Sequence, residues 1–176
     1  GGSLQDKLKA TAAFMIDVML YNPHILCIQE HMKYIYSRRE FDNIYQIPGY
    51  QLILHSKAEY LEPERQTGRP SGGLAIWVTD EIAESYRFYR ERDTTNIQQL
   101  IMKPKTQYKD NPSIHLTNVY CKPEWNDSKL TQFYEKIAIK SEHNDKIRIQ
   151  IGDWNSRLTS VGDKEDNKYG KKLQQY

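Results

Sequence analysis

The stretch Ile-Arg-Ile-Gln-Ile-Gly-Asp-Trp-Asn, residues 147–155, decides the fold of this chain. Its three isoleucines alternate with polar residues, which is the side-chain period of a β-strand with one apolar face. The same period places Asp153 and Asn155 in phase with the isoleucines, so the apolar face runs directly into a carboxylate and an amide. We therefore expect a strand that ends at a functional site.

Two strands upstream have the same construction. In residues 24–30 two apolar side chains are in phase with Glu30, and in residues 114–120 two others are in phase with Asn118 and Tyr120. Each residue alone has an ordinary explanation, because strand-end acids are often solvated, tyrosines often pack in cores, and Asp or Asn often starts a turn. Together they favour a single site, formed if the strands lie side by side or in facing sheets.

The composition is that of one soluble globular domain. The chain has 176 residues, of which 38% are hydrophobic, 27% charged and 11% aromatic, which excludes disordered and fibrous classes. The formal net charge of +2 gives no strong nucleic-acid signal by itself. The 13 tyrosines are suited to wet binding surfaces, because each has an apolar body and a polar tip.

The two cysteines and the apolar stretches indicate an intracellular protein. Cys27 lies in an apolar strand and Cys121 follows Tyr120, so we expect buried, reduced thiols without a nucleophilic role. The longest apolar stretch, Ala12–Leu20, is short and contains Asp17, which excludes a membrane span. No cleavable secretory signal is visible.

The remaining pattern alternates helices and short strands. Apolar spacing predicts an amphipathic helix over about 4–21, with Met15, Ile16 and Met19 on its packed face, ended by Asn22-Pro23. Asn126 is expected to cap a second helix that runs to about residue 137. Further strands are expected at about 50–55, 74–78 and 96–102, an exposed loop at 58–73 and a hairpin tip at 103–112.

These motifs, in this order, resemble the endonuclease/exonuclease/phosphatase superfamily, and most closely the endonuclease domains of non-LTR retrotransposons. The matching segments are Pro23–Glu30, Ser71–Ile76, Thr117–Pro123, Ile151–Arg157 and Asn167–Leu173. The resemblance spans nearly the whole chain and implies an α/β fold: a four-layered, DNase I-like α/β sandwich of two packed mixed β-sheets flanked by helices. It also implies a Mg²⁺-dependent DNA endonuclease that nicks one strand and leaves a 3′-hydroxyl for a reverse transcriptase.

The resemblance assigns a role to each strand-end residue. Glu30 takes the place of the glutamate that binds the catalytic cation, and Tyr120 that of the tyrosine that hydrogen-bonds the scissile phosphate. Asp153 matches the aspartate that positions or deprotonates the attacking water, and Asn155 the asparagine that orients this water. The chemistry is reasonable, because Mg²⁺ prefers oxygen ligands and a carboxylate within reach can accept the proton of water.

Other residues are weaker candidates for substrate contacts. Asn118 supports the site or contacts substrate, although a buried amide bonded to backbone is the favoured explanation. Trp125 suits either a substrate contact or packing on the following helix, whereas Trp154 is expected to pack between layers. Charged loop residues are expected either to contact DNA phosphates or to be ordinary solvated surface charges, and the sequence favours neither explanation. These residues are Arg65, Arg69, Lys103 and Lys105.

The sequence also departs from the family pattern. Family members begin with a strand that carries an asparagine and end with an Asp-His pair, and neither is found within residues 1–176. We therefore expect one domain truncated at both ends, which is a fragment or is completed by a further segment or chain. The alternatives are a phosphodiesterase acting on abasic DNA, RNA or phosphoinositide, and a catalytically incomplete relative that binds nucleic acid or protein. The expected location is the nucleus, with no membrane partner.

Overall fold

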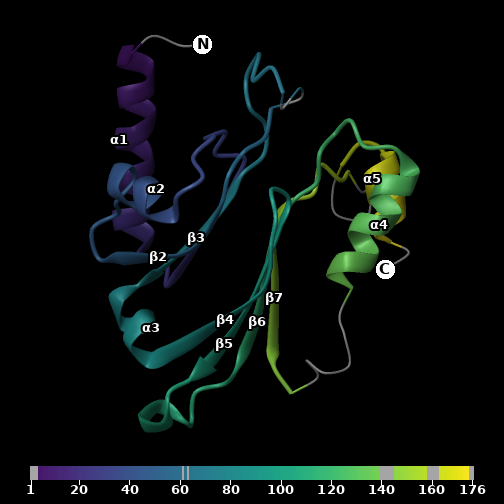
Figure 1. Cartoon of the computed structure of the whole chain (residues 1–176). Coiled ribbons are helices and arrows are strands. Elements are labelled where there is room, and N and C mark those ends of the chain that lie inside the picture. The colour runs from purple at the N-terminus through teal and green to yellow at the C-terminus, as the bar shows by residue number, and fades with distance from the viewer. Residues whose placement is uncertain (1–3, 61, 63, 139–144, 158–162, 175–176) are drawn as a thin grey trace.

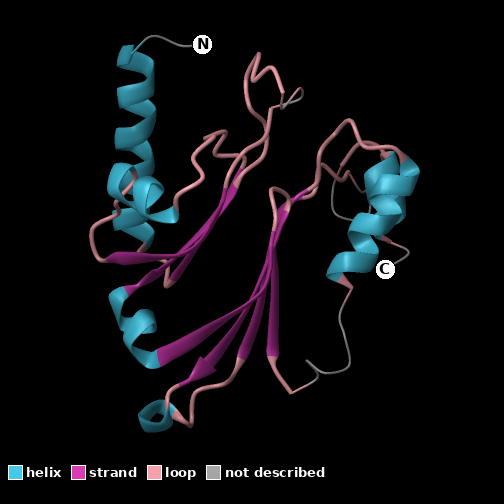
Figure 2. Ribbon diagram, viewed as in Figure 1, coloured by secondary structure: helices cyan, strands magenta, loops and turns pink. Residues whose placement is uncertain are grey.

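The chain forms four layers in the order helix, sheet, sheet, helix (Figures 1 and 2). The structure is a computed structural model that describes residues 4–60, 62, 64–138, 145–157 and 163–174. Its elements are α1 (Leu4–Tyr21), β1 (Ile25–Gln29), α2 (Arg38–Ile44), β2 (Tyr50–Ser56), β3 (Leu74–Thr79), α3 (Asp80–Ser85), β4 (Tyr86–Asp93), β5 (Ile97–Pro104), the 3₁₀ turn η1 (Thr106–Tyr108), β6 (Ile114–Tyr120), α4 (Asp127–Ile137), β7 (Ile147–Asp153) and α5 (Lys168–Leu173).

The two sheets differ in how their strands run. The first has the order β1-β3-β2 and is antiparallel, whereas the second has the order β4-β5-β6-β7 and becomes parallel between β6 and β7. A parallel pair needs a long crossover, and the segment that contains α4 supplies it. The register of this pair sets Tyr120 directly beside Asp153, at the ends of both strands.

Apolar side chains fill each of the three spaces between the layers. Residues that share the space between the two sheets include Leu54, Ile76, Leu100, Met102 and Leu116. Helices α4 and α5 cover the outer face of the second sheet through Val119, Leu130, Phe133, Tyr134 and Tyr169. Helices α1 and α2 cover the outer face of the first sheet through Val18, Phe41, Leu52, Ala75 and Trp77. The expected four-layered α/β sandwich is therefore confirmed.

The first helix has the expected bounds but not the expected packed face. Met15 packs with Phe14 and Val18 against the first sheet, whereas Ile16 is 63% exposed and Met19 77% exposed. The prediction that these last two residues lie on the packed face is wrong. Nearly every residue from 14 to 20 is apolar, so the sequence does not single out one face, and the neighbouring sheet selects it.

Several other sequence expectations are confirmed. Asn126 caps α4 by accepting a hydrogen bond from the backbone N–H of Lys129, at 3.0 Å. Trp154 packs between layers, with its ring parallel to that of Tyr134 at a centroid distance of 6.3 Å. Both cysteines are free thiols, Cys121 buried as expected and Cys27 only half-buried, and burial raises the pKa of each to about 12. Of the helices described, none is both long and apolar enough to cross a bilayer.

Candidate active site

Three acidic and phenolic side chains meet where the strands end. Glu30 lies close enough to Tyr120 for its charge to act on the Tyr120 hydroxyl, and Tyr120 is only 5% exposed. The pKa of Tyr120 is raised, first by burial, then by the negative charge of Glu30, and further by those of Glu124 and Asp153. The hydroxyl therefore stays protonated at neutral pH and is an uncharged hydrogen-bond donor near these carboxylates.

Glu30 reaches this position through a break in the strand period. The strand β1 ends at Gln29, and Glu30 has a φ of +55°, in the left-handed region. Leu26 and Ile28 pack on the helix-covered side of the sheet, so an uninterrupted strand would direct Glu30 to that side as well. The left-handed residue instead turns the chain so that its carboxylate lies near the Tyr120 hydroxyl. A non-glycine residue in this region is strained and persists only where its surroundings hold it.

Two glycines hold this bend. The backbone N–H groups of His31 and Met32 donate to the carbonyls of Gly73 and Gly72, at 3.3 and 3.0 Å. Gly73 has a φ of +86°, and a Cβ there would lie 2.4 Å from the His31 ring. Its own N–H donates to the carbonyl of Thr95, at 3.2 Å. The Gly-Gly motif is therefore explained by a close approach of three chain segments next to Glu30.

Asn155 fastens the ends of β6 and β7 together. Its side-chain amide donates to the carbonyl of Cys121 at 2.7 Å, and its backbone N–H donates to Oδ1 of Asp153 at 3.0 Å. Its own carbonyl accepts from Nδ2 of Asn167, at 2.8 Å. Asn167 also caps α5 by accepting from the N–H of Gly170. This arrangement orients the exposed carboxylate of Asp153 and explains the Asn-x-x-Gly stretch of the sequence.

Asn118 lies beneath the site, between the two sheets. It is 0% exposed, and its Oδ1 accepts a hydrogen bond of 2.7 Å from Nε2 of Gln29. Its Nδ2 donates to the carbonyl of Ile28 at 3.3 Å and to Oε1 of Gln98 at 3.2 Å. The buried-amide explanation fits these contacts, and a buried Asn118 supports the strands that carry Glu30 and Tyr120 rather than reaching outward.

The four basic residues singled out from the sequence do not gather at one place. Arg65 and Arg69 are exposed on the loop whose end, Ser71, pairs with Glu59 near the site. Lys103 and Lys105 lie at the opposite end of β5, about 20 Å along the strand from the residue that pairs with Val119. The structure therefore does not bring these two lysines to the site, because charge on a loop says nothing about which end of a sheet the loop occupies.

Several residues that position the site carry no strong sequence signal. Asn96 donates from Nδ2 to the carbonyl of Tyr120 at 3.0 Å and accepts from the Tyr120 N–H at 2.9 Å. Gln29 and Gln98 complete the amide contacts around Asn118. Asn96 and the glutamines look like ordinary turn and strand residues in the sequence. Only the pairing of the strands reveals their contacts.

The described residues contain no group of three or more His, Cys, Asp or Glu side chains close enough to hold a metal ion by themselves. Glu30 and Asp153 both act on the Tyr120 hydroxyl, as Glu124 also does, so carboxylates surround this end of the strands. Such carboxylates suit Mg²⁺, which keeps several waters and is commonly bound by one or two carboxylates together with substrate phosphates.

Known proteins resemble this chain in structure rather than in sequence. No protein-family model matches it, and no curated protein matches it in sequence. The endonuclease domain of TRAS1, a telomere-specific non-LTR retrotransposon, is 20% identical over 94% of this chain and 64% of its own, with a TM-score of 0.57. The AP endonuclease LMAP from Leishmania major is 12% identical over 95% of this chain and 60% of its own, with a TM-score of 0.62. The human Nocturnin catalytic domain is 16% identical over 82% of this chain and 55% of its own, with a TM-score of 0.50.

These neighbours establish the class of fold. All three belong to the endonuclease/exonuclease/phosphatase superfamily, so the resemblance seen in the sequence motifs is confirmed in the fold. The chain spans 64% of the TRAS1 domain and 60% of LMAP, which is less than two thirds of either.

Proposed function

We propose that this chain is part of a Mg²⁺-dependent DNA endonuclease of a non-LTR retrotransposon. It would hydrolyse one strand of a duplex and leave a 3′-hydroxyl from which a reverse transcriptase extends, which requires access to nuclear DNA. The observation that carries the proposal is the position of Tyr120 directly beside Asp153 at the paired ends of β6 and β7, with Glu30 acting on the same hydroxyl. A neutral donor next to two carboxylates suits a phosphodiester, whose oxygens accept hydrogen bonds while a cation offsets their charge.

Each residue has a distinct part in this reaction. Asp153 is exposed and already oriented by the N–H of Asn155, so it accepts the proton of the attacking water. Tyr120 donates its hydroxyl proton in a hydrogen bond to a phosphoryl oxygen without adding a net charge. Glu30 would hold Mg²⁺, which neutralises phosphate charge and stabilises the leaving oxygen when bound. Arg65 and Arg69, on the loop at this end, would contact flanking phosphates.

We also propose that further strands complete the two sheets. Strands β1 and β7 are each outermost in their sheets among the described residues, and β1 packs over both β6 and β7. The two open edges therefore lie on the same side, where Ile147 and Ile151 of β7 are exposed. Strands from a further segment or chain would cover these residues and supply the Asp-His pair that the resemblance implies.

A nicking assay tests the proposed function. Protein that includes the flanking coding sequence is incubated with supercoiled plasmid and Mg²⁺, beside an Asp153→Ala variant. We expect nicking that falls by about 10²- to 10⁴-fold in the variant, because the proton acceptor is lost. A Lys109→Ala control, changed at the opposite end of the sandwich, keeps full activity. Unchanged nicking by Asp153→Ala contradicts the proposed mechanism.

The same assay separates the alternatives. Cleavage confined to abasic DNA would favour a repair-type activity. This alternative is considered because the chain resembles the AP endonuclease LMAP in structure. Cleavage of phosphoinositide alone, or salt-sensitive DNA binding without cleavage, would contradict the retrotransposon assignment. Robust nicking by residues 1–176 alone would contradict the proposed need for further strands.

A further inference from the structure

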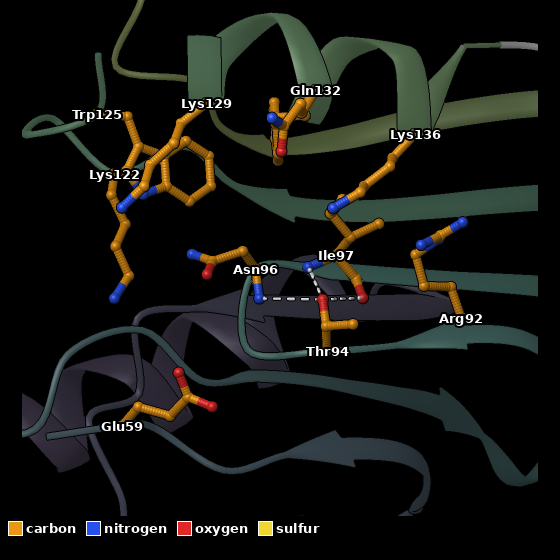
Figure 3. A pocket seen from close by; sticks show the side chains of 11 residues that line it. Glu59, Arg92, Thr94, Asn96, Ile97, Lys122, Trp125, Lys129, Gln132 and Lys136 are labelled. Atoms are coloured by element: carbon orange, nitrogen blue, oxygen red, sulfur yellow. Dashed lines mark hydrogen bonds between the residues drawn. The ribbon is translucent and has the colours of Figure 1, made fainter. Parts of the chain in front are cut away.

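A basic pocket lies beside the candidate active site, on the α4 side of the second sheet. It has a volume of about 400 Å³ and lies between α4, the β4–β5 turn and Glu59, as Figure 3 shows. A cavity of this size is within the range that accepts small ligands. Its cationic lining side chains are Arg92, Lys122, Lys129 and Lys136, which come from β4, the end of β6 and α4.

Among the described residues, positive charges outnumber negative ones in this basic pocket. Four cationic side chains line it together with one carboxylate, that of Glu59. Lys122 donates to the hydroxyl of Ser71 at 3.0 Å, and Arg92 to Oε1 of Gln99 at 3.1 Å, and both acceptors are uncharged. Within the described ranges, no ion pair joins any of the four cations to a carboxylate. The pocket therefore attracts an anion.

One wall of the basic pocket is a fixed aromatic ring. The indole of Trp125 packs against the ring of Phe133, with centroids 5.1 Å apart and planes 60° apart. The two rings also line the pocket, and Figure 3 shows the indole close to Lys122 and Lys129. A half-buried indole held in this way offers a stacking surface for a nucleobase, and every base has a face that can stack.

Hydrogen bonds join the basic pocket to the candidate active site. Asn96, which lines the pocket, exchanges two hydrogen bonds with the backbone of Tyr120, at 3.0 and 2.9 Å. Neighbouring strands lie about 5 Å apart, and successive nucleotides rise roughly 3.4 Å along a duplex. A strand held at Tyr120 therefore reaches the pocket within a few nucleotides.

We propose that the basic pocket binds an unpaired nucleotide of the substrate strand, a few positions from the cleaved bond. The lysines contact its phosphates, and its base stacks on Trp125. Stacking on the indole requires a base whose face is free, whereas both faces of a base within a duplex are covered by its neighbours. The pocket thus selects sites where the strand is opened or easily unstacked. This inference rests on the proposed function, because it takes nucleic acid as the substrate.

Binding measurements without metal test the basic pocket separately from catalysis. The full chain is titrated in EDTA with a fluorescent duplex that contains one unpaired nucleotide, and with the fully paired duplex. We expect the wild type to prefer the first duplex about tenfold. Trp125→Ala abolishes the preference, and Trp125→Phe keeps most of it, because a phenyl ring still stacks. Retention of the preference in a folded Trp125→Ala variant overturns the proposal.

The charge contribution has its own matched control. Lys129→Ala/Lys136→Ala should lower affinity by tenfold or more and reduce the salt slope of log affinity by about 1.4 to 1.8, the value for two phosphate contacts. The control is Arg87→Ala/Lys109→Ala, which removes two exposed charges at the far end of the sandwich and leaves affinity unchanged. Equal losses in the two double variants overturn the proposal.

The outcomes distinguish the pocket from the proposed function. If the wild type nicks DNA but the pocket variants bind and nick as it does, the pocket proposal is wrong and the function stands. If the pocket variants lose binding while no metal-dependent nicking is found with flanking sequence restored, the function is wrong and the pocket stands.

Discussion

The two layers on either side of the β1-β3-β2 sheet satisfy their buried polar groups very differently. On the side that faces the second sheet, the amide of Asn118 is bonded to Gln29 and Gln98 and to backbone. On the helix-covered side, both ring nitrogens of His55 and Nε1 of Trp77 are buried without a hydrogen-bond partner in the part of the chain described. A buried polar group without a partner is destabilising, so the helix-covered side is the less well-satisfied layer.

The helix-covered side of the β1-β3-β2 sheet is also the less closely packed of the two layers. The helix-covered side contains a mainly apolar hollow of about 490 Å³, lined by residues that include Met15, Phe41 and Trp77. The inter-sheet layer has a smaller hollow of about 300 Å³, lined in part by Leu54, Phe88 and Leu100. The layer directly beneath the candidate site is thus the more closely packed of the two. Positions there should tolerate substitution poorly, whereas positions under the helices should tolerate it better.

The largest effect is expected from Asn118→Leu. The substitution removes the donor to Oε1 of the fully buried Gln98 and the acceptor of the half-buried Gln29, which should lower the free energy of unfolding by about 3–4 kcal/mol. Urea denaturation followed by circular dichroism measures the loss. A loss below about 1 kcal/mol would contradict the special status of the inter-sheet layer.

Gly152→Ala should come next. A Cβ at this position would lie 2.1 Å from the carbonyl oxygen of Val119, where β7 meets β6, so the strands must separate. We expect a loss of about 2–3 kcal/mol in unfolding free energy, and reduced nicking, because Asp153 would move away from Tyr120. Gly49→Ala is the control: its φ is +80° but no atom lies within 4 Å, so only backbone strain of about 1 kcal/mol is expected. Equal losses for the two variants would show that the close approach does not matter.

His55→Leu tests the helix-covered side and, unlike the two substitutions above, should not lower the free energy of unfolding at neutral pH. Burial, and to a lesser extent the charge of His31, lowers the pKa of His55 from 6.5 to about 4. The unfolded chain therefore binds more protons between these values, and the folded state loses stability as the pH falls from 6.5 towards 4.

We expect His55→Leu to be neutral or stabilising at pH 7 and to lose less stability than the wild type at pH 5. Denaturation at both pH values measures the difference, which should be on the order of 1–2 kcal/mol. His31, whose pKa burial also lowers, leaves a residual pH dependence. An unchanged pH dependence in the variant would mean that His55 is protonated in the folded chain.

The smallest effect is expected on the outward face of α1. Val18 is buried against the first sheet, and Val18→Ala should lower the free energy of unfolding by about 1–2 kcal/mol. The neighbouring Met19 is exposed, and Met19→Ala should change the free energy of unfolding by no more than about 0.5 kcal/mol. Thermal denaturation of the two variants measures both effects. A comparable loss for Met19→Ala would mean that its side chain is covered in solution.

Local periodicity predicted those parts of the site where a strand stays regular up to its end. Along β6 the alternation is unbroken, and Asn118 and Tyr120 lie on the face that the sequence predicts. Glu30 joins them for a reason that the alternation misses, because its left-handed φ reverses the expected direction. That conformation depends on Gly72 and Gly73, more than 40 residues further along the chain, and so cannot be read from residues 24–30.

Other features depend on contacts that no local pattern encodes. The spacing of apolar residues in α1 fits several faces, and only the sheet beneath it decides that Val18 is buried while Ile16 is exposed. Charge identified Lys103 and Lys105 as candidates, but the strand direction of β5 places them at the wrong end. The basic pocket combines residues from separate elements, and of these the sequence singles out only Trp125.

The double use of Asn167 ties the last described helix to the chemistry. The side-chain oxygen of Asn167 caps α5, and its side-chain nitrogen donates a hydrogen bond to the backbone carbonyl of Asn155. Winding that helix and setting the geometry around Asp153 are thus one cooperative event. A chain cut just before residue 167 would keep Asp153 yet lose the contact that holds Asn155 beside it, so a short helix late in the sequence helps to set the geometry of the catalytic carboxylate.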